Sequence, residues 1–238
     1  IQSTVSAGTT QGFSIVSYTG TTGGASSTIG HGLGQTPDLV ILKPRSYSGA
    51  WWWSQKDRSN KVLELQAGNA EVDPSTSFGG GGLKYSTFTS SVFGGTDGSS
   101  NDDLWNTSGA TYIAYCYKSI KNFSKISTFV GNGSTDGSFL FCDFSPSFVM
   151  IKNASTSNKH WYIFDNKRSP RNEANIVLAG NYNNDERWWG TGNKIDWLSN
   201  GIKIRSNSDI NNSGDTFVFM AFADSPFYTS TGIPTTAR

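Results

Sequence analysis

The chain carries one series of sequence features twice. Each half opens with Phe-Ser, then has an apolar run that ends in lysine, then a tryptophan cluster, and closes with Ser-Gly-x-Thr and an aromatic run. The offsets between the matching features are 110, 109 and 105 residues. Four features that recur at nearly one offset indicate an internal repeat, and a unit of this length is the size of a domain. The sequence therefore predicts two tandem copies of one small fold.

The composition favours β-structure in both copies. Only 16% of the residues are charged and 13% are aromatic, while glycine occurs 27 times. Long helices are usually built from Ala, Leu, Glu, Lys and Arg, and the chain has few stretches of that kind. Short β-branched and aromatic runs separated by Gly, Ser and Asn are typical of an all-β protein. We expect two homologous antiparallel β-sandwich units of jelly-roll-like type, packed together because the junction 118–122 is very short.

The expected boundaries follow from the repeat. Residues 1–11 are polar and predict a linker, 12–121 the first repeat, 122–227 the second repeat, and 228–238 a loose C-terminal tail. The runs 39–42 and 148–151 are continuously apolar, which predicts strands in the middle of a sheet. Residues 112–117 alternate between aromatic and small side chains, which indicates one side of a sandwich core.

Charge, cysteine content and hydropathy narrow the possible functions. The net charge is +1, so no field is available to hold nucleic acid or an acidic membrane. Cys116 and Cys142 lie in apolar runs, which predicts buried, reduced thiols and synthesis in a reducing cytosol. The sequence shows no signal peptide, and no apolar stretch approaches 18 residues, so we expect no membrane insertion.

The tryptophan-rich segments are the candidate ligand-binding sites. In an extended strand Trp51 and Trp53 share a face and Trp52 points the other way, so at least one of them is expected to be exposed in part. Flat aromatic faces beside Asn, Asp and Arg are what a sugar-binding groove needs, and the segment 181–189 offers both. The candidate residues are Trp51, Trp52, Trp53, Trp105, Tyr182, Asp185, Arg187, Trp188 and Trp189. The same rings could instead belong to the core or to subunit contacts.

The sequence assigns no catalytic, cofactor-binding or metal-binding residue. The acidic pairs 102–103 and 185–186 are adjacent on one loop, whereas glycoside cleavage needs two carboxylates set apart across a groove. His31 and His160 are the only histidines, which is too few for a histidine-based metal site. We therefore expect a protein that is not an enzyme.

A further set of short motifs resembles a domain repeated in structural and tail-fibre-like proteins of tailed bacteriophages, especially phages of aquatic bacteria. The motifs are Gly12-Phe13-Ser14, Tyr18-Thr19-Gly20, Gly30-His31-Gly32-Leu33-Gly34, Ser108-Gly109, the strand 112–117, Phe123-Ser124-Lys125, Gly131-Asn132-Gly133, Asp136-Gly137, Leu198-Ser199-Asn200-Gly201 and 221–227. The likeness covers about residues 12–227. It implies a virion protein at the tail or capsid surface, made in the cytoplasm of the bacterial host, with no catalytic residues to carry over.

Three functions remain open on this basis. The first is a receptor-binding module that attaches to a host surface glycan or protein. The second is a purely structural virion component, such as a capsid decoration, a fibre segment or an adaptor. The third is a polysaccharide depolymerase. The expected partners are other copies of the chain, as a homotrimer by analogy with the family, other virion proteins and the host receptor.

Overall fold

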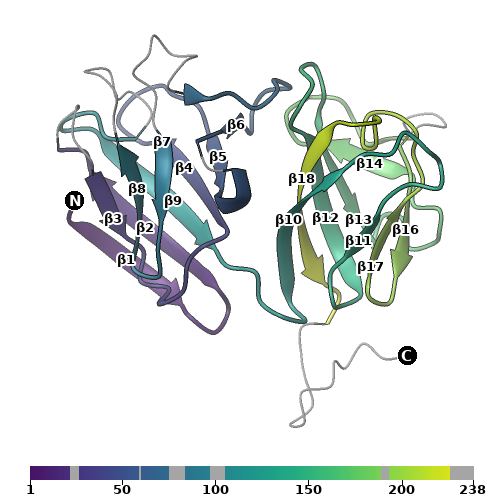
Figure 1. The fold of residues 1–238 in the computed structure, drawn as a ribbon, viewed down its shortest axis with the longest axis horizontal. Helices are drawn as coiled ribbons and strands as arrows, with labels where there is room; N and C mark the ends of the chain where they lie inside the picture. The colour runs from purple at the N-terminus through teal and green to yellow at the C-terminus, as the bar shows by residue number, and fades with distance from the viewer. Residues whose placement is uncertain (22–26, 59, 75–83, 97–104, 189–192, 226–238) are drawn as a thin grey trace. The chain divides into compact units, whose positions relative to one another are not determined.

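The computed structural model describes residues 1–21, 27–58, 60–74, 84–96, 105–188 and 193–225. It divides into two compact units (Figure 1). Unit 1 comprises Ile1–Gln66 and Glu71–Lys118, and unit 2 comprises Ala67–Ala70 and Ser119–Arg238. The main division therefore falls at 118/119, close to the expected one, while residues 67–70 and 119–121 of the expected first repeat belong to unit 2. The packing of the two units against each other stays a prediction.

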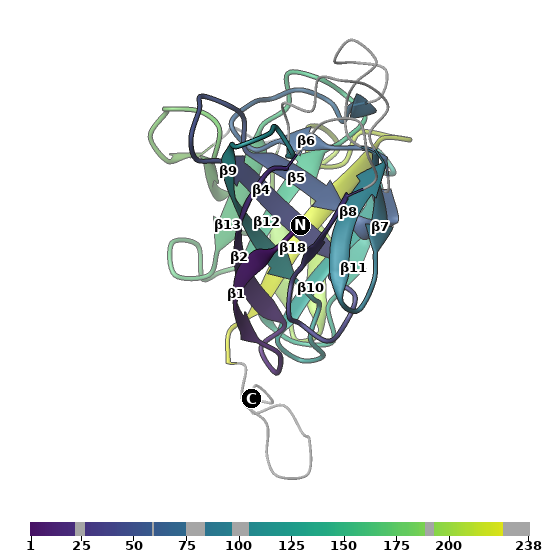
Figure 2. The same cartoon turned by 90° about the vertical axis from the view of Figure 1, so that its left-hand side faces the viewer.

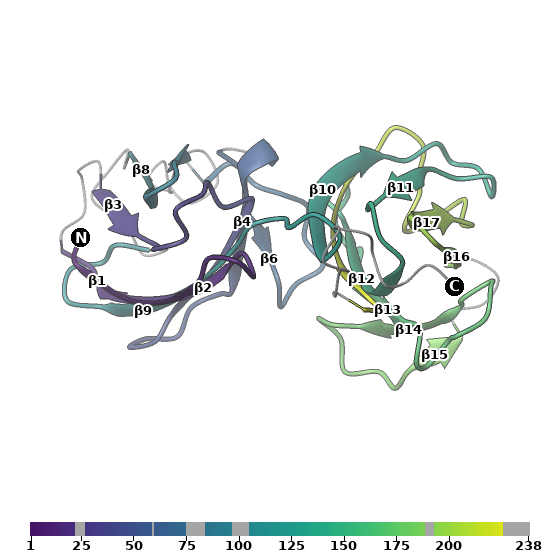
Figure 3. The same ribbon diagram turned by 90° about the horizontal axis from the view of Figure 1, so that it is seen from below.

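Unit 1 is built from two antiparallel sheets. The strands are β1 (Ser3–Gly8), β2 (Phe13–Thr19), β3 (Ser27–Gly30), β4 (Leu39–Pro44), β5 (Trp52–Gln55), β6 (Leu63–Glu64), β7 (Lys84–Phe88), β8 (Val92–Thr96) and β9 (Thr111–Tyr117), and the 3-10 helix η1 (Lys56–Arg58) follows β5. The large sheet has the order β1-β2-β9-β4-β5-β6 and the small sheet the order β3-β8-β7. Figure 3 shows β3 and β8 lying over β1, β2 and β9.

Unit 2 repeats this arrangement. Its strands are β10 (Ser124–Val130), β11 (Phe139–Phe141), β12 (Pro146–Asn153), β13 (Trp161–Asp165), β14 (Ile176–Ala179), β15 (Arg187–Trp188), β16 (Ile195–Leu198), β17 (Gly201–Ile204) and β18 (Thr216–Ala223). The large sheet has the order β10-β18-β12-β13-β14-β15 and the small sheet the order β11-β17-β16. Apart from β1 and β15, each strand has a counterpart at the same place in the other unit.

The register of the strands matches as well as their order. Lys43 lies opposite Ile113 on β9, and Lys152 lies opposite Val218 on β18. Inside both cores an aromatic pair joins the same two strands. The rings of Tyr18 and Tyr112 are stacked with centroids 5.1 Å apart, and those of Phe129 and Phe217 are stacked at 4.9 Å. This is the pattern that a duplication would leave, although the duplication itself stays a prediction.

A buried asparagine holds the same loop in both units. The side-chain oxygen of Asn106 accepts a hydrogen bond from Thr21 N at 3.0 Å, and that of Asn211 accepts one from Asn132 N at 3.1 Å. Both residues are fully buried. Three residues further on, Gly109 and Gly214 adopt φ of 75° and 80°, a region that favours glycine. The Ser-Gly-x-Thr signature therefore marks a turn that a buried asparagine anchors in the same way in both units.

The cores lie between the large and small sheets of each unit. In unit 1, Ile29 of β3 and Phe93 of β8 face Val16, Val40 and Ala114 of the large sheet. In unit 2 the corresponding cluster combines residues of β11, β16 and β17 with residues of β12, β13 and β18. The expected all-β fold with antiparallel β-sandwich units is confirmed, and the apolar runs 39–42 and 148–151 form inner strands as predicted. Both cysteines are buried free thiols, also as predicted.

The N-terminal segment is not the linker that its polar composition suggested. Residues 3–8 form β1, which pairs with β2 from Ser3 opposite Tyr18 to Gly8 opposite Phe13 (Figure 2). The sequence predicted a linker because most side chains of this edge strand are exposed and polar. The backbone pairing with β2 fixes the strand without an apolar pattern. The tail 228–238 lies outside the described residues.

Candidate functional site

Three of the expected ligand-binding tryptophans are buried. Trp52 and Trp105 belong to the apolar core of unit 1, and Trp53 is also buried. Their rings are therefore unable to present a face to a ligand, and the prediction for these three residues was wrong. The alternation expected for an extended strand is present, since Trp52 faces the core and Trp53 lies outside that cluster. All four residues of β5 are nevertheless buried, which the sequence pattern did not reveal.

Trp51 is partly exposed and lies at one end of a row of aromatic rings. Its indole is stacked with the ring of Tyr115, with centroids 6.2 Å apart and planes 24° apart. Tyr115 is stacked in turn with Phe13 at 6.3 Å and 6°. Phe13 contacts Tyr117 at 4.8 Å. All four side chains are partly exposed. We call Trp51, Tyr115, Phe13 and Tyr117 the aromatic row.

The strand register of unit 1 explains why these rings meet. On β9, Tyr112, Ala114 and Cys116 point into the core, so Tyr115 and Tyr117 point to the opposite face of the large sheet. Phe13 of the neighbouring strand lies opposite Tyr117 and therefore shares that face. The alternation of residues 112–117 was visible in the sequence, but it did not say which face was the core. As a result Phe13, Tyr115 and Tyr117 were missed as candidate ligand contacts.

A second exposed aromatic side chain lies in unit 2. Tyr182 is 51% exposed, and its ring contacts His160 with centroids 5.0 Å apart. The neighbouring Asn181 fixes the loop, because its side-chain oxygen accepts a hydrogen bond from Trp161 N at 2.9 Å. Asp185 lies exposed on the same loop. This loop therefore offers one ring face beside polar groups, as the sequence suggested, whereas His160 was not expected to take part.

The remaining candidates of this segment are described only in part. Arg187 and Trp188 form β15 and pair with Val177 and Ile176 of β14. Their side chains, and the whole of Trp189, lie outside the described part of the structure.

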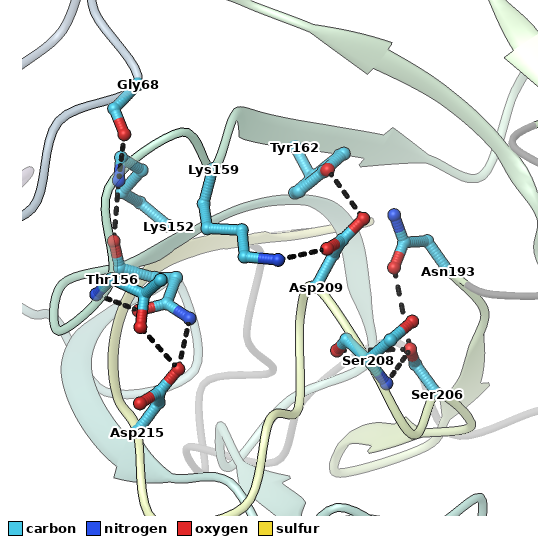
Figure 4. Close-up of polar contacts among 11 residues, drawn as sticks. Gly68, Lys152, Thr156, Lys159, Tyr162, Asn193, Ser206, Ser208, Asp209 and Asp215 are labelled. Atoms are coloured by element: carbon cyan, nitrogen blue, oxygen red, sulfur yellow. Dashed lines mark hydrogen bonds and ion pairs between the residues drawn. The ribbon is translucent and has the colours of Figure 1, made fainter.

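Polar side chains form a network on unit 2 (Figure 4). The carboxylate of Asp209 accepts from Lys159 Nζ at 2.6 Å and from the hydroxyl of Tyr162 at 3.2 Å. Burial shifts the pKa of Asp209 upward, but the hydrogen bond and charge of Lys159 outweigh it and leave the pKa below its usual value. Burial and the charge of Asp209 raise the pKa of Tyr162. Asp209 therefore stays ionised and Tyr162 neutral near pH 7, which suits a structural clamp.

Lys152 of β12 lies beside this network (Figure 4). Its side chain is fully buried, and burial followed by the charge of Lys159 lowers the pKa to about 8. Its Nζ donates to the carbonyl of Asn153 at 2.6 Å and lies 3.5 Å from the carbonyl of Gly68. An amine enclosed in this way has no exposed path to a substrate, so we interpret Lys152 as a buried structural donor.

No group of three or more His, Cys, Asp or Glu side chains that could hold a metal ion occurs among the described residues. Within the same part of the chain, no helix has the length and apolarity needed to cross a membrane.

Comparison with known proteins gives one family and no individual relative. Neither curated proteins nor solved structures include a match to the chain. One family model, described as a domain of unknown function, matches residues 1–226 and so spans both units. The chain belongs to this family, DUF7483.

Proposed function

We propose that the chain is a non-enzymatic attachment module of a tailed-bacteriophage virion that binds a glycan on the host cell surface. The attribution to a virion comes from the sequence motifs quoted above. The observation that supports a glycan ligand is the aromatic row, in which the rings of Trp51, Tyr115 and Phe13 are nearly parallel and partly exposed. Such rings can take the apolar C–H face of successive sugar residues.

The arrangement suits weak, repeated binding. Stacking on an exposed, flat row buries little area, so the affinity of one site is expected to be low. A virion presents many copies, and simultaneous contacts raise the overall affinity without any new contact. Tyr182 with His160 on unit 2 is a second candidate contact for the same ligand class.

A glycan array that displays bacterial lipopolysaccharides and capsular polysaccharides tests this proposal. We expect the wild-type chain, presented multivalently, to bind a subset of the glycans. Tyr115→Ala should weaken that binding about tenfold, because truncation of an aromatic contact in a binding site is expected to cost about 1.4 kcal/mol or more. Tyr115→Phe keeps the ring and should retain binding. Equal binding by both variants would contradict the proposal.

One observation favours the alternative of a structural virion component. Phe139 and Phe141 are among the most exposed large apolar side chains of the described residues. Exposed phenylalanines of this kind are typical of contacts between protein subunits. The two functions are compatible if attachment uses unit 1 and assembly uses unit 2.

Depolymerase activity has less support. Two acidic groups of unit 2 take part in ion pairs, Asp209 with Lys159 at 2.6 Å and Asp196 with Arg205 at 2.6 Å. Glycoside cleavage needs a protonated acid and a second carboxylate across a groove. The release of new reducing ends from host polysaccharide, measured after incubation with the chain, would support this function.

A further inference from the structure

The two units differ along one side of the sandwich. In unit 1 this side is closed by β1, which pairs with the outer edge of β2 over six residues. Strand β1 also reaches the small sheet, because the Ser3 hydroxyl donates to the carbonyl of Gly30 on β3 at 2.9 Å. One extra strand therefore covers the edges of both sheets of unit 1.

The same side of unit 2 has only a partial cover. Strands β10 and β11 correspond to β2 and β3, and no strand among the described residues pairs with their outer edges. Ser119 caps the first half of β10, since its hydroxyl accepts from Ile126 N at 3.0 Å. Alternate residues of an edge strand direct their backbone groups outward, so beyond Ile126 the outward positions are Thr128 and Val130.

Apolar side chains gather where the cover ends. Val130 is 60% exposed, Phe139 45% and Phe141 54%. The rings of Phe139 and Phe141 contact each other, with centroids 6.4 Å apart, and the hydroxyl of Ser138, which precedes Phe139, donates to the carbonyl of Val130 at 3.0 Å. We call Val130, Phe139 and Phe141 the edge patch.

The edge patch has no apolar counterpart in unit 1. By strand register, Phe139 corresponds to Thr28 and Phe141 to Gly30, since Ile29 lies opposite Phe93 as Leu140 lies opposite Ile202. An exposed edge strand with apolar side chains is prone to pair with another chain unless something covers it. Ile120 and Ser119 already bond to Ser124 and Ile126, so only the part of the β1 position beyond Ile126 is unfilled among the described residues of unit 2.

The charges beside the edge patch are balanced. Lys203, opposite Phe139, forms an ion pair with Asp136 at 2.8 Å. Arg205 lies 3.7 Å from Asp136 and pairs with Asp196 at 2.6 Å. A surface with paired charges of both signs does not select a strongly acidic or basic partner, but it is compatible with an identical surface.

We propose that the edge patch is the surface through which a second copy of this chain docks. Two copies related by a two-fold axis can place the open part of β10 antiparallel to its equivalent and bury the phenylalanines of both. A strand of this same chain already occupies the corresponding place in unit 1, which supports a β-strand as the occupant. The inference does not depend on glycan binding.

Sedimentation equilibrium of the wild-type chain and of the variant Phe139→Thr/Phe141→Thr tests the proposal. Threonine keeps strand propensity and removes the apolar rings. We expect a wild-type dimer whose dissociation constant rises about 100-fold or more in the variant, since each buried phenylalanine contributes strongly to association. Leu178→Thr, which changes an exposed apolar side chain on β14, is the matched control and should leave the dimer unchanged.

Hydrogen exchange gives an independent reading. The amides of Thr128 and Val130 should exchange more slowly as the protein concentration rises.

A wild-type monomer up to high micromolar concentration would overturn the proposal, as would a dimer that persists in a folded double variant. A trimer that depends on the patch would overturn the two-fold arrangement. If the double variant fails to fold, Val130→Lys supplies the same comparison. The Trp51→Ala variant should still dimerise, so a failure of the glycan-binding proposal can be told apart from a failure of the dimer proposal.

Discussion

Lys43 of unit 1 and Lys152 of unit 2 stand at the same register of corresponding strands but in different surroundings. Lys43 is half-buried and donates to the carbonyl of Gly49, whereas Lys152 is fully buried and donates to the carbonyl of Asn153. The edge patch shows the same contrast, because Phe139 and Phe141 have no apolar counterparts in unit 1. The comparison teaches that strand order, register and loop anchors are shared, while the surfaces differ.

The largest expected effect tests the loop geometry that the two units share. A Cβ atom at Gly20 would lie 2.2 Å from the carbonyl oxygen of Thr107, and one at Gly131 would lie 2.2 Å from that of Asn212. Both neighbours are backbone atoms and have little freedom to move. We expect Gly20→Ala and Gly131→Ala each to lower the free energy of unfolding by about 4 kcal/mol. Urea denaturation followed by tryptophan fluorescence measures both. A severe loss in one unit only would break the equivalence.

The buried asparagines should both give a clear loss of stability. Asn211 donates to the carbonyls of Ser134 and Ser206 and accepts from Asn132 N, whereas Asn106 accepts from Thr21 N and donates to the hydroxyl of Ser27.

Alanine leaves these buried partners unsatisfied, so we expect Asn211→Ala and Asn106→Ala each to lower the free energy of unfolding by about 2 to 3 kcal/mol. Calorimetric unfolding of the two variants measures both losses. A negligible loss in either variant would contradict the shared role of the two asparagines.

The pH dependence of stability sharpens the contrast between the lysines. The pKa of Lys152 falls from 10.5 to about 8 on folding, so the unfolded chain binds more protons between these values. Stability should therefore rise with pH across this window, and the cost of the buried charge is fully present at pH 7.

Lys152→Met removes that cost, so the advantage of the variant over the wild type should shrink by about 3 kcal/mol between pH 7.5 and pH 10.5. Urea unfolding at a series of pH values measures it. A constant difference would show that Lys152 is not held in an apolar setting.

The smallest expected effect concerns the thiols, which both units bury. Burial raises the pKa of Cys116 and of Cys142 to about 12. Because the thiolate is the reactive form, neither should react with an aromatic disulfide reagent in the native protein at pH 8, and both should react in urea. Rapid labelling of one native thiol would show that its unit opens locally.

Strong periodic patterns made much of the fold predictable. The inner strands β4 and β12 and the two-unit division followed from apolar runs and from the repeat. Strands β1, β3 and β8 were missed because they are rich in Ser, Thr and Gly, and backbone pairing rather than side-chain pattern holds them.

The candidate site was predictable only in part, for a physical reason. Alternation shows that a strand has two different faces but not which face is buried. At least one partly exposed ring was expected among residues 51–53, and Trp51 is that ring. Which of the tryptophans are buried was not predictable, because only the packing around Trp52, Trp53 and Trp105 decides it. The edge patch was invisible because it depends on which strand of unit 2 has no neighbour.

The most direct test of the proposed glycan contact is saturation-transfer NMR with a bacterial polysaccharide that the wild-type chain retains on the array. Saturation of the protein's aromatic protons should appear on the C–H protons of the bound sugar and should be lost in the folded variant Trp51→Ala/Tyr115→Ala. Transfer of the same strength in this variant would contradict the assignment of the aromatic row as the glycan-binding surface.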